Sequence, residues 1–371
     1  MIVGVLREPL PETRVSLLPE SAAALVKKGI SIVVEKGAGL GAFATDDDYS
    51  KAGASIASAA DVVQQADIIC SIHQPSLTIA PGKILIGAYQ PLYFPKQMQT
   101  WAQASLTVFS LDMLPRTTRA QSMDILSSQA NIAGYKAVLK AASVYPRYFP
   151  MFMTAAGSIP PAKVLILGAG VAGLQAIATA RRLGAVVEVF DTRPAVKEEV
   201  MSLGAKFIEV EGAADASKAG GYAVEQSAEF QQRQKARIAE SIAKADIVIT
   251  TAQIPGKPAP ILVTTSMIEA MRSGSVIVDL AAATGGNTEQ TKNNETVLYN
   301  GVSIIGDSML AATASSDASK LYGKNLLNFL QLITAKDNSV ALNWDDDLVK
   351  GSCITHEGKL VHERVVAAAG N

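Results

Sequence analysis

Few features of this sequence point to a charged partner, a metal or an oxidising compartment. Its 371 residues include 33 basic and 34 acidic side chains, a balance that does not suggest a nucleic-acid partner. The two cysteines, Cys70 and Cys353, fit a reducing compartment; we expect buried thiols, and a disulfide stays an alternative. The three histidines are scattered, and we predict no metal site.

Long apolar runs are also missing. No segment reaches the ~18 to 20 continuous apolar residues that a membrane-spanning helix needs. The first residues, Met1–Val5, are typical of a β-strand and lack the basic region and cleavage site of a signal peptide. We therefore expect a soluble, cytoplasmic chain.

The most informative segment is residues 163–173, with the sequence KVLILGAGVAG. An apolar run leads into glycines spaced G-x-G-x-x-G, a helical pattern follows, and a second apolar run ends at Asp191. This is the dinucleotide-binding βαβ fingerprint in its full context. Its glycines permit a tight turn, close approach of a pyrophosphate and close packing of helix on strand, and the helix N-terminus favours the anion. The predicted phosphate-binding residues are Gly168, Gly170, Val171, Ala172 and Gly173.

Asp191 and Arg193 bear on which dinucleotide is bound. A carboxylate at the end of the second strand can accept hydrogen bonds from the adenosine ribose, and it repels a 2′-phosphate, which favours NAD(H) over NADP(H). Arg193 lies two residues on and could reach a 2′-phosphate. A second interpretation of Asp191 is a helix N-cap ahead of Pro194.

Short apolar runs alternate with helical patterns along the rest of the chain. This alternation predicts an α/β fold with two Rossmann-like, doubly wound parallel-sheet domains, joined by long helices and separated by a cleft. We place a discontinuous N-terminal domain at residues 1–126 plus 317–371, and the NAD(H)-binding domain at 127–316. The joining helices are predicted at Gln121–Ala142 and Ser316–Thr334. The small, glycine-rich segment Glu211–Tyr222 suits a mobile lid over the nucleotide, or else a plain surface insertion.

A polar cluster precedes the first long helix. Arg116, Gln121, Asp124 and Ser127 offer charge, amide and hydroxyl groups, and the last three recur every three residues, as on one helical face. They suit hydrogen bonding to a nicotinamide carboxamide and ribose. The alternative is that Asp124 and Ser127 are capping groups and Arg116 is a surface charge. Acid/base candidates are few: His73 follows a strand, where a single histidine is more often structural than catalytic.

Several motifs resemble the alanine dehydrogenase and transhydrogenase superfamily. They include Val5–Glu8, Glu12–Val15, Leu18-Pro19, and more specifically Pro115–Asn131, Ala133-Gly134-Tyr135 and Pro255–Pro260. The last three motifs and the fingerprint are similar to the NAD(H)-binding α-subunit domain of proton-translocating transhydrogenase. This resemblance covers nearly the full length of the chain.

This resemblance implies roles for individual residues. Those matching Arg116, Gln121, Asp124 and Ser127 hold the nicotinamide end of NAD(H), with Tyr135 beside them. Asp191 binds the adenosine ribose, and a loop with Gly221 and Tyr222 closes over the nucleotide. The family also implies a homodimer, NADP(H) on a partner subunit, membrane-spanning subunits that translocate protons, and a peripheral position on the inner face of the cytoplasmic membrane.

Departures from alanine dehydrogenase are equally informative. His73, Gln90 and Ala283 stand where that enzyme has its substrate-binding lysine, catalytic histidine and catalytic aspartate, and only Arg14 resembles its carboxylate-binding arginine. Hydride transfer between two nicotinamides needs no general acid or base, so the sequence favours transhydrogenation with the second ring on a partner. The alternatives are a soluble alanine dehydrogenase-type amino-acid dehydrogenase and a non-catalytic NAD-sensing module.

Overall fold

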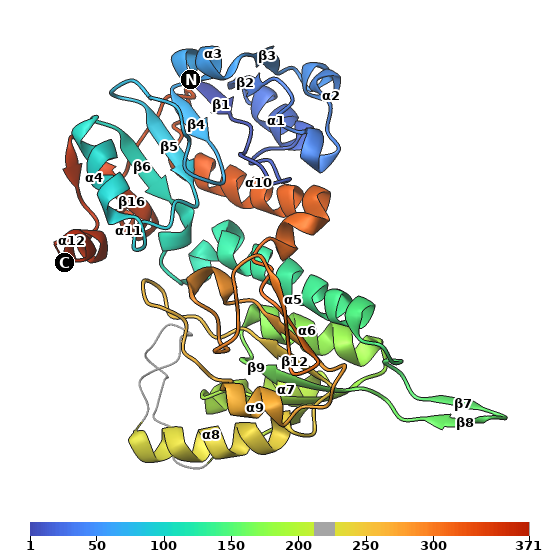
Figure 1. The fold of residues 1–371 in the computed structure, drawn as a ribbon. Coiled ribbons are helices and arrows are strands. Elements are labelled where there is room, and N and C mark those ends of the chain that lie inside the picture. The colour runs from blue at the N-terminus through green and yellow to red at the C-terminus, as the bar shows by residue number, and fades with distance from the viewer. Residues whose placement is uncertain (211–226, 371) are drawn as a thin grey trace. The chain divides into compact units, whose positions relative to one another are not determined.

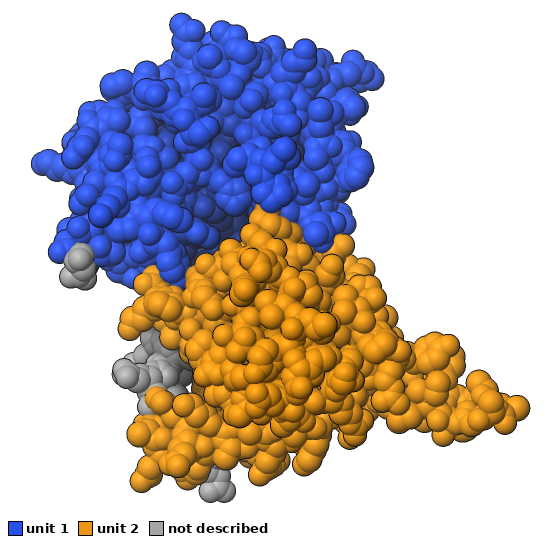
Figure 2. All heavy atoms as spheres, viewed as in Figure 1, with its two compact units in different colours: residues 1–129, 312–371 blue, residues 130–311 orange. Residues whose placement is uncertain are grey.

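The computed structural model describes residues 1–210 and 227–370, which divide into two compact units (Figures 1 and 2). Unit 1 comprises residues 1–129 and 312–371, and unit 2 comprises residues 130–311. Unit 1 is thus assembled from both ends of the chain, with unit 2 inserted between them. The predicted lid, with Gly221 and Tyr222, lies outside the described residues.

Unit 1 is built on an eight-stranded sheet in the order β17-β16-β6-β5-β4-β1-β2-β3. The chain runs from central β1 outward through β2 and β3, then crosses to the other side of β1 for β4, β5 and β6. All neighbours among β1–β6 are parallel, whereas β16 is antiparallel to β6 and to β17. The strands are β1 (Ile2–Val5), β2 (Ser31–Glu35), β3 (Ser55–Ala57), β4 (Ile68–Cys70), β5 (Ile84–Gly87), β6 (Thr107–Ser110), β16 (Cys353–His356) and β17 (Lys359–Leu360).

Unit 1 has an apolar cluster that joins its two chain segments. The N-terminal segment supplies α1 (Pro19–Val26), α2 (Asp46–Lys51), α3 (Ala59–Gln65) and α4 (Pro95–Gln103), and the C-terminal segment supplies α10 (Ser315–Leu332), α11 (Asp347–Ser352) and α12 (Glu363–Ala369). Tyr322, Leu326 and Phe329 of α10 are fully buried in one cluster with Val3 and Val5 of β1. The long helix predicted at Ser316–Thr334 therefore packs into the core of unit 1.

Unit 2 contains a seven-stranded sheet in the order β11-β10-β9-β12-β13-β15-β14, parallel except for β14. The chain again starts near the centre and winds to both sides, so the prediction of two doubly wound parallel sheets is confirmed. The strands are β9 (Lys163–Leu167), β10 (Val186–Phe190), β11 (Lys206–Phe207), β12 (Ile247–Thr250), β13 (Val276–Asp279), β14 (Thr296–Tyr299) and β15 (Val302–Ile305). The helices are α6 (Val171–Arg182), α7 (Lys197–Ser202), α8 (Ala228–Ile242) and α9 (Thr265–Glu269).

The predicted helix at Gln121–Ala142 is wrong at its start. Residues Thr118–Met123 form a 3₁₀ helix (η3), and the α-helix α5 spans Ile125–Val144. Asp124 separates the two with an extended backbone, at φ −76° and ψ 92°. Because Gln121 precedes this break, Gln121, Asp124 and Ser127 do not share one face of an α-helix.

A two-stranded hairpin follows α5. Strands β7 (Phe152–Thr154) and β8 (Gly157–Ile159) pair only with each other, antiparallel, and form the protruding ribbon at the edge of unit 2 in Figure 1. The side chains of Met151 and Met153 are 62% and 75% exposed. Among residues 1–210 and 227–370, no helix combines the length and apolar character required to span a bilayer.

Candidate functional site

The glycine loop between β9 and α6 has the geometry that the fingerprint predicts. Gly168 has φ +107°, and a Cβ atom there would overlap the hydroxyl oxygen of Thr251, which follows β12. A Cβ atom at Gly173 would overlap the carbonyl oxygen of Gly168. Both positions therefore require glycine, one for backbone conformation and one for the close return of the helix to the strand end.

Gly170 differs from its two neighbours in the motif. A Cβ atom at this position would meet nothing within 4 Å, so packing within the protein does not explain the glycine. Gly170 is the N-cap of α6, and the amides of Val171, Ala172 and Gly173 belong to the first turn, where N–H groups lack partners within the helix. An anionic group can approach this end closely, attracted by the amides and by the positive end of the helix dipole.

Asp191 follows β10 and contacts both the glycine loop and Arg193. Its Oδ2 atom accepts a 2.7 Å hydrogen bond from the backbone N–H of Ala169, within the loop. Its carboxylate also accepts hydrogen bonds from the backbone N–H and the guanidinium of Arg193, and the side-chain hydrogen bonds raise the pKa of that arginine. The next short helix, η4 (Pro194–Val196), has Arg193 rather than Asp191 at its N-cap, so the helix-capping alternative does not describe Asp191.

Helix α5 packs against the start of α6. A Cβ atom at Gly134 would overlap the carbonyl oxygen of Ala172, and Asn131 donates a 3.3 Å hydrogen bond to Gln175. Tyr135, the predicted neighbour of the nicotinamide end, lies on the same helix and is 43% exposed. In the sequence, Gly134 interrupts the long helical pattern and belongs to a family motif, but neither feature predicted its contact with Ala172, although a glycine inside a helical pattern often marks close packing.

A buried polar network supports the loop after β12. The side-chain amide of Asn287 accepts a hydrogen bond from the backbone N–H of Ala252 and donates to the carbonyl oxygens of Ala252 and Pro260. Asp279, also fully buried, accepts from the backbone N–H of Asn287. These bonds close the segment between Ala252 and Pro260, which follows Thr251 at the glycine loop. Neither residue could be predicted from the sequence, because hydrogen bonds across loops leave no periodic signal.

In unit 1, the structure joins two of the four predicted nicotinamide-end residues. Asp124 accepts hydrogen bonds from the backbone N–H of Ser127 at 2.9 Å and from its hydroxyl at 2.6 Å. This is the geometry of an N-cap on α5, so the capping alternative describes these contacts. Arg116 and Gln121 are exposed, and Gln121 lies on η3.

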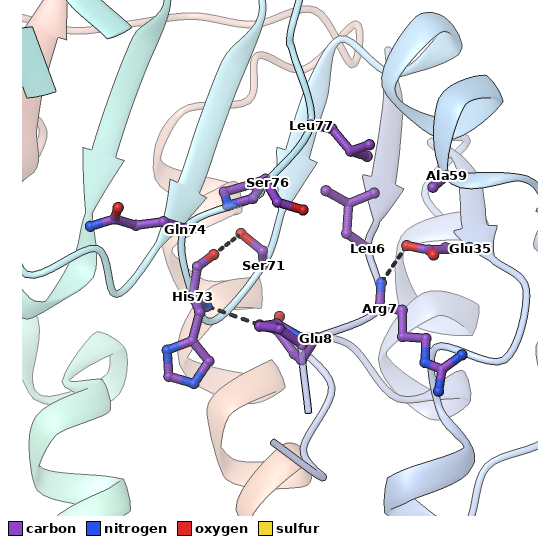
Figure 3. A pocket seen from close by; sticks show the side chains of 12 residues that line it. Leu6, Arg7, Glu8, Glu35, Ala59, Ser71, His73, Gln74, Ser76 and Leu77 are labelled. Carbon is purple, nitrogen blue, oxygen red and sulfur yellow. Dashed lines mark hydrogen bonds between the residues drawn. The ribbon is translucent and has the colours of Figure 1, made fainter. Parts of the chain in front are cut away.

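Unit 1 also has a pocket of about 260 Å³ at the carboxyl ends of its central strands (Figure 3). It is lined by residues after β1 and β4, including Arg7, Glu8, His73 and Gln74, and by Glu35 at the end of β2. A second pocket of about 260 Å³ shares His73 and Gln74 and includes Gln90.

The charged groups near His73 are bound to one another. The Nε2 atom of His73 lies 2.8 Å from Oε2 of Glu12, which also pairs with Arg14 at 2.6 Å. Burial opposes ionisation of Glu12, but the hydrogen bonds from Arg14 and His73 outweigh it and hold the pKa of Glu12 well below its usual range. The imidazole is thus hydrogen-bonded to the Glu12–Arg14 ion pair within unit 1.

Glu8 connects the loops after β1 and β4. Its two carboxylate oxygens accept hydrogen bonds from the backbone N–H groups of Ile72, at 2.5 Å, and His73, at 3.0 Å. The bond from His73 is drawn in Figure 3. Burial raises the pKa of Glu8 to about 7, and the two backbone hydrogen bonds offset only part of this effect. The group therefore titrates near neutral pH, which gives this region of unit 1 a pH-dependent stability.

Comparisons with known proteins identify the family of the chain. Residues 4–133 match the family described as "Alanine dehydrogenase/PNT, N-terminal domain", and residues 137–363 match "Alanine dehydrogenase/PNT, C-terminal domain". The chain belongs to the alanine dehydrogenase/PNT family.

Within that family, transhydrogenases are more similar to the chain than alanine dehydrogenases. It is 45% identical to the first of the polypeptides that form the NAD(P) transhydrogenase subunit alpha of Rhodospirillum rubrum, covering 98% of both chains. The structure of a transhydrogenase from Sinorhizobium meliloti matches with a TM-score of 0.89 and 48% identity, covering 97% of this chain and 100% of that one. An L-alanine dehydrogenase structure matches with a TM-score of 0.82 and 26% identity, covering 99% of both chains.

These relatives confirm the predicted resemblance to transhydrogenase α subunits and the assignment to the oxidoreductases. They also confirm the class of cofactor, a nicotinamide dinucleotide in a protein that works with NAD(H) and NADP(H). As a subunit alpha, the Rhodospirillum rubrum relative belongs to a protein with further subunits.

Proposed function

We propose that the chain is the NAD(H)-binding component of a proton-translocating transhydrogenase. It exchanges hydride between NAD(H) held here and NADP(H) held by a partner subunit, and separate membrane subunits couple this exchange to proton translocation. The observation that carries the proposal is a nucleotide-binding loop with the required geometry in a chain that lacks the acid/base residues of its dehydrogenase relatives.

The residues at three positions support a hydride transfer that is not accompanied by proton transfer. Gln90 and Ala283 cannot act as general acids or bases at neutral pH, and His73 is engaged with Glu12. Oxidation of an amino acid requires removal of a proton together with the hydride, whereas exchange between two nicotinamides requires none. The replaced residues are therefore the ones that only the dehydrogenase reaction uses.

NAD(H) supplies the hydride chemistry when it is bound, and the chain binds and orients it. The first-turn amides of α6, at Val171, Ala172 and Gly173, hold the pyrophosphate, and Gly170 leaves room for it. Asp191 accepts hydrogen bonds from the adenosine ribose. The contact of Asp191 with the Ala169 amide links recognition of the ribose to the conformation of the phosphate loop.

At the other end of the cofactor, Arg116, Gln121, Asp124 and Ser127 hold the nicotinamide, with Tyr135 beside it. Hydrogen bonds to the carboxamide and ribose fix the ring, and such orientation is the main contribution that a protein can make to a direct transfer. Exclusion of water protects the hydride donor during transfer. Because Asp124 also caps α5, it fixes the start of the helix on which Ser127 and Tyr135 lie.

A homodimer at the inner face of the cytoplasmic membrane completes the proposal, held there through the partner subunits. The β7–β8 hairpin supports the dimer because a two-stranded ribbon is marginally stable alone. Met151, Phe152 and Met153 expose apolar side chains there, and residues 148–162 contain no charged side chain. Light scattering measures the oligomeric state; a monomer at micromolar concentration would contradict this element of the proposal.

The test of function is direct hydride transfer. The purified chain is mixed with the NADP(H)-binding subunit of a relative, NADPH deuterated at C4, and an NAD⁺ analogue whose reduced form absorbs at a distinct wavelength. We expect the analogue to be reduced and to acquire the deuterium. Lack of transfer despite binding of both nucleotides would refute the proposal.

A parallel reaction tests the dehydrogenase alternative. The chain is incubated with NAD⁺ and L-alanine, and absorbance of NADH is followed. We expect no NADH above the rate without alanine, because the positions of the catalytic histidine and aspartate are occupied by Gln90 and Ala283. Brisk NADH production would favour the dehydrogenase function instead.

A further inference from the structure

The carboxylate of Asp191 has its hydrogen-bonding capacity filled by the protein itself. Oδ1 accepts from the backbone N–H of Arg193 at 2.8 Å and from its Nε at 2.9 Å. Oδ2 accepts from the backbone N–H of Ala169 at 2.7 Å and from a terminal nitrogen of Arg193 at 2.8 Å. An ionised carboxylate offers about four acceptor positions, so no position remains for a ribose hydroxyl.

The guanidinium of Arg193 makes the two bonds that can be released. The backbone bonds from Ala169 and Arg193 belong to the fold of the loop, whereas the two side-chain bonds depend on one rotamer of one arginine. The side chains of Arg193 and Asp191 are 17% and 6% exposed. The pair is therefore shielded from water, and its two parallel charge-assisted bonds make it stronger than a surface contact.

Departure of the guanidinium would free one acceptor position on each oxygen, while the two backbone bonds keep the carboxylate oriented. A ribose carries two neighbouring hydroxyl groups, each able to donate one hydrogen bond. The forked pair of donors on Arg193 thus occupies the same two positions as the 2′- and 3′-hydroxyl groups of an adenosine ribose. A vicinal diol thus supplies the number of donors that the two freed positions accept.

We propose that Arg193 is an internal competitor of the nucleotide: its guanidinium occupies the ribose subsite on Asp191 and must move away when NAD(H) binds. The inference rests on the nucleotide-binding function proposed above and adds a device that sets affinity and specificity. The apparent dissociation constant rises when the site is open for only a fraction of the time, in inverse proportion to that fraction. Arg193 therefore weakens NAD(H) binding.

The displaced arginine also bears on discrimination between cofactors. A 2′-phosphate cannot donate the hydrogen bond that the 2′-hydroxyl makes, and its charge is repelled by Asp191. The same phosphate attracts the guanidinium of Arg193. Asp191 thus rejects NADP(H) only while its negative charge outweighs the neighbouring cation, and the two residues together determine the preference.

The first experiment measures NADH and NADPH binding to the purified chain and to Arg193→Met by isothermal titration calorimetry. We expect Arg193→Met to bind NADH ~3- to 10-fold more tightly, because the competitor is gone, and NADPH no more tightly. Arg182→Met removes a cation from an exposed position on α6 and should leave both affinities unchanged. A purely structural role of Arg193 predicts weaker binding of both nucleotides.

The second experiment removes the negative charge that holds the Arg193 side chain and leaves the arginine in place. Asp191→Asn should weaken NADH binding and lower the preference for NADH over NADPH by roughly tenfold or more, because the free guanidinium meets the 2′-phosphate. In the double variant, Asp191→Asn with Arg193→Met, the gain for NADPH should disappear.

The outcomes separate this inference from the proposed function. If the unaltered chain binds NADH and Arg193→Met binds it equally or less tightly, the competitor role is refuted and the proposed function stands. If the unaltered chain binds no NADH, both fail. A gain in NADPH binding that persists in the double variant would refute the role of Arg193 in discrimination.

Discussion

Gly134 of α5 lies directly against the carbonyl oxygen of Ala172, in the first turn of α6. A methyl group at position 134 would overlap that oxygen, so the two helices would have to separate. We expect Gly134→Ala to lower the free energy of unfolding by about 1–3 kcal/mol and to weaken NADH binding, because the displaced turn carries the phosphate-binding amides. Chemical denaturation and calorimetry measure the two effects.

Ser143→Ala, at an exposed position of the same helix, is the matched control and should change neither quantity. A Gly134→Ala protein with unchanged NADH affinity would show that the packing of α5 on α6 does not position the phosphate site.

Substitutions at two glycines of the loop should differ in their effects on stability and on NADH binding. Gly173→Ala should destabilise the protein by about 1–3 kcal/mol, because its Cβ atom would overlap the carbonyl oxygen of Gly168. Gly170→Ala places its methyl group in open space and should leave stability almost unchanged, yet it should weaken NADH binding by roughly tenfold or more where the pyrophosphate approaches. Thermal unfolding and NADH titration of both variants separate the roles; equal affinity of Gly170→Ala and the unaltered chain would remove Gly170 from the site.

Asp124 caps α5 in the structure and is proposed to hold the nicotinamide, and substitutions can separate the two roles. Asn is also a good N-cap, so Asp124→Asn should retain stability, while Asp124→Ala should lower it by about 1 kcal/mol. If the carboxylate also orients the nicotinamide, both variants should slow hydride transfer more than they weaken NADH binding. Single-turnover transfer with the partner subunit, set beside the NADH dissociation constant, tests this. Transfer at the unaltered rate in Asp124→Asn would leave Asp124 with the capping role alone.

The buried carboxyl of Glu8 predicts a pH dependence of stability. Its pKa is raised from 4.5 in the unfolded chain to about 7 in the fold, so between these values the folded state binds the extra proton. Stability from this group is therefore complete below pH 4.5 and is lost as the pH rises through 7, by up to about 3 kcal/mol.

Urea denaturation at about pH 5 and about pH 8, on either side of the folded-state pKa, measures this loss. Glu8→Gln, which cannot ionise, should show a smaller decrease between the two pH values, and the exposed control Glu198→Gln should behave like the unaltered chain. An identical decrease in Glu8→Gln would mean that other groups cause the pH dependence.

The sequence predicted the features that depend on local pattern. The buried strand ending at Leu167, the glycine spacing and the terminal acid at Asp191 follow from neighbouring residues alone, and the structure has each of them. The short helix at Asp46–Lys51 was missed because it has few apolar residues, although Thr45 and Asp48 form a capping box that could have revealed it.

Features that depend on the backbone conformation of one residue or on one rotamer were harder to predict from the sequence. The helix break at Asp124 was missed because Gln121, Asp124 and Ser127 fit helical spacing equally well, and only the backbone of Asp124 separates the 3₁₀ turn from α5. Likewise, the sequence placed Asp191 and Arg193 two residues apart but gave no sign that the guanidinium of Arg193 fills the remaining acceptor positions of the Asp191 carboxylate. That outcome depends on a rotamer and on the Ala169 amide contributed by another loop.

Unit 1 takes its sheet from both ends of the chain, and this has a consequence for biosynthesis. While the ribosome is still translating residues 312–371, every residue of unit 2 has already been made, but α10 and β16 have not joined β1 and β6. The inserted unit can thus acquire its fold first, and the apolar face that later receives Tyr322 and Phe329 stays open on the nascent chain. A chaperone that shields nascent apolar surface would find its target on the first 129 residues.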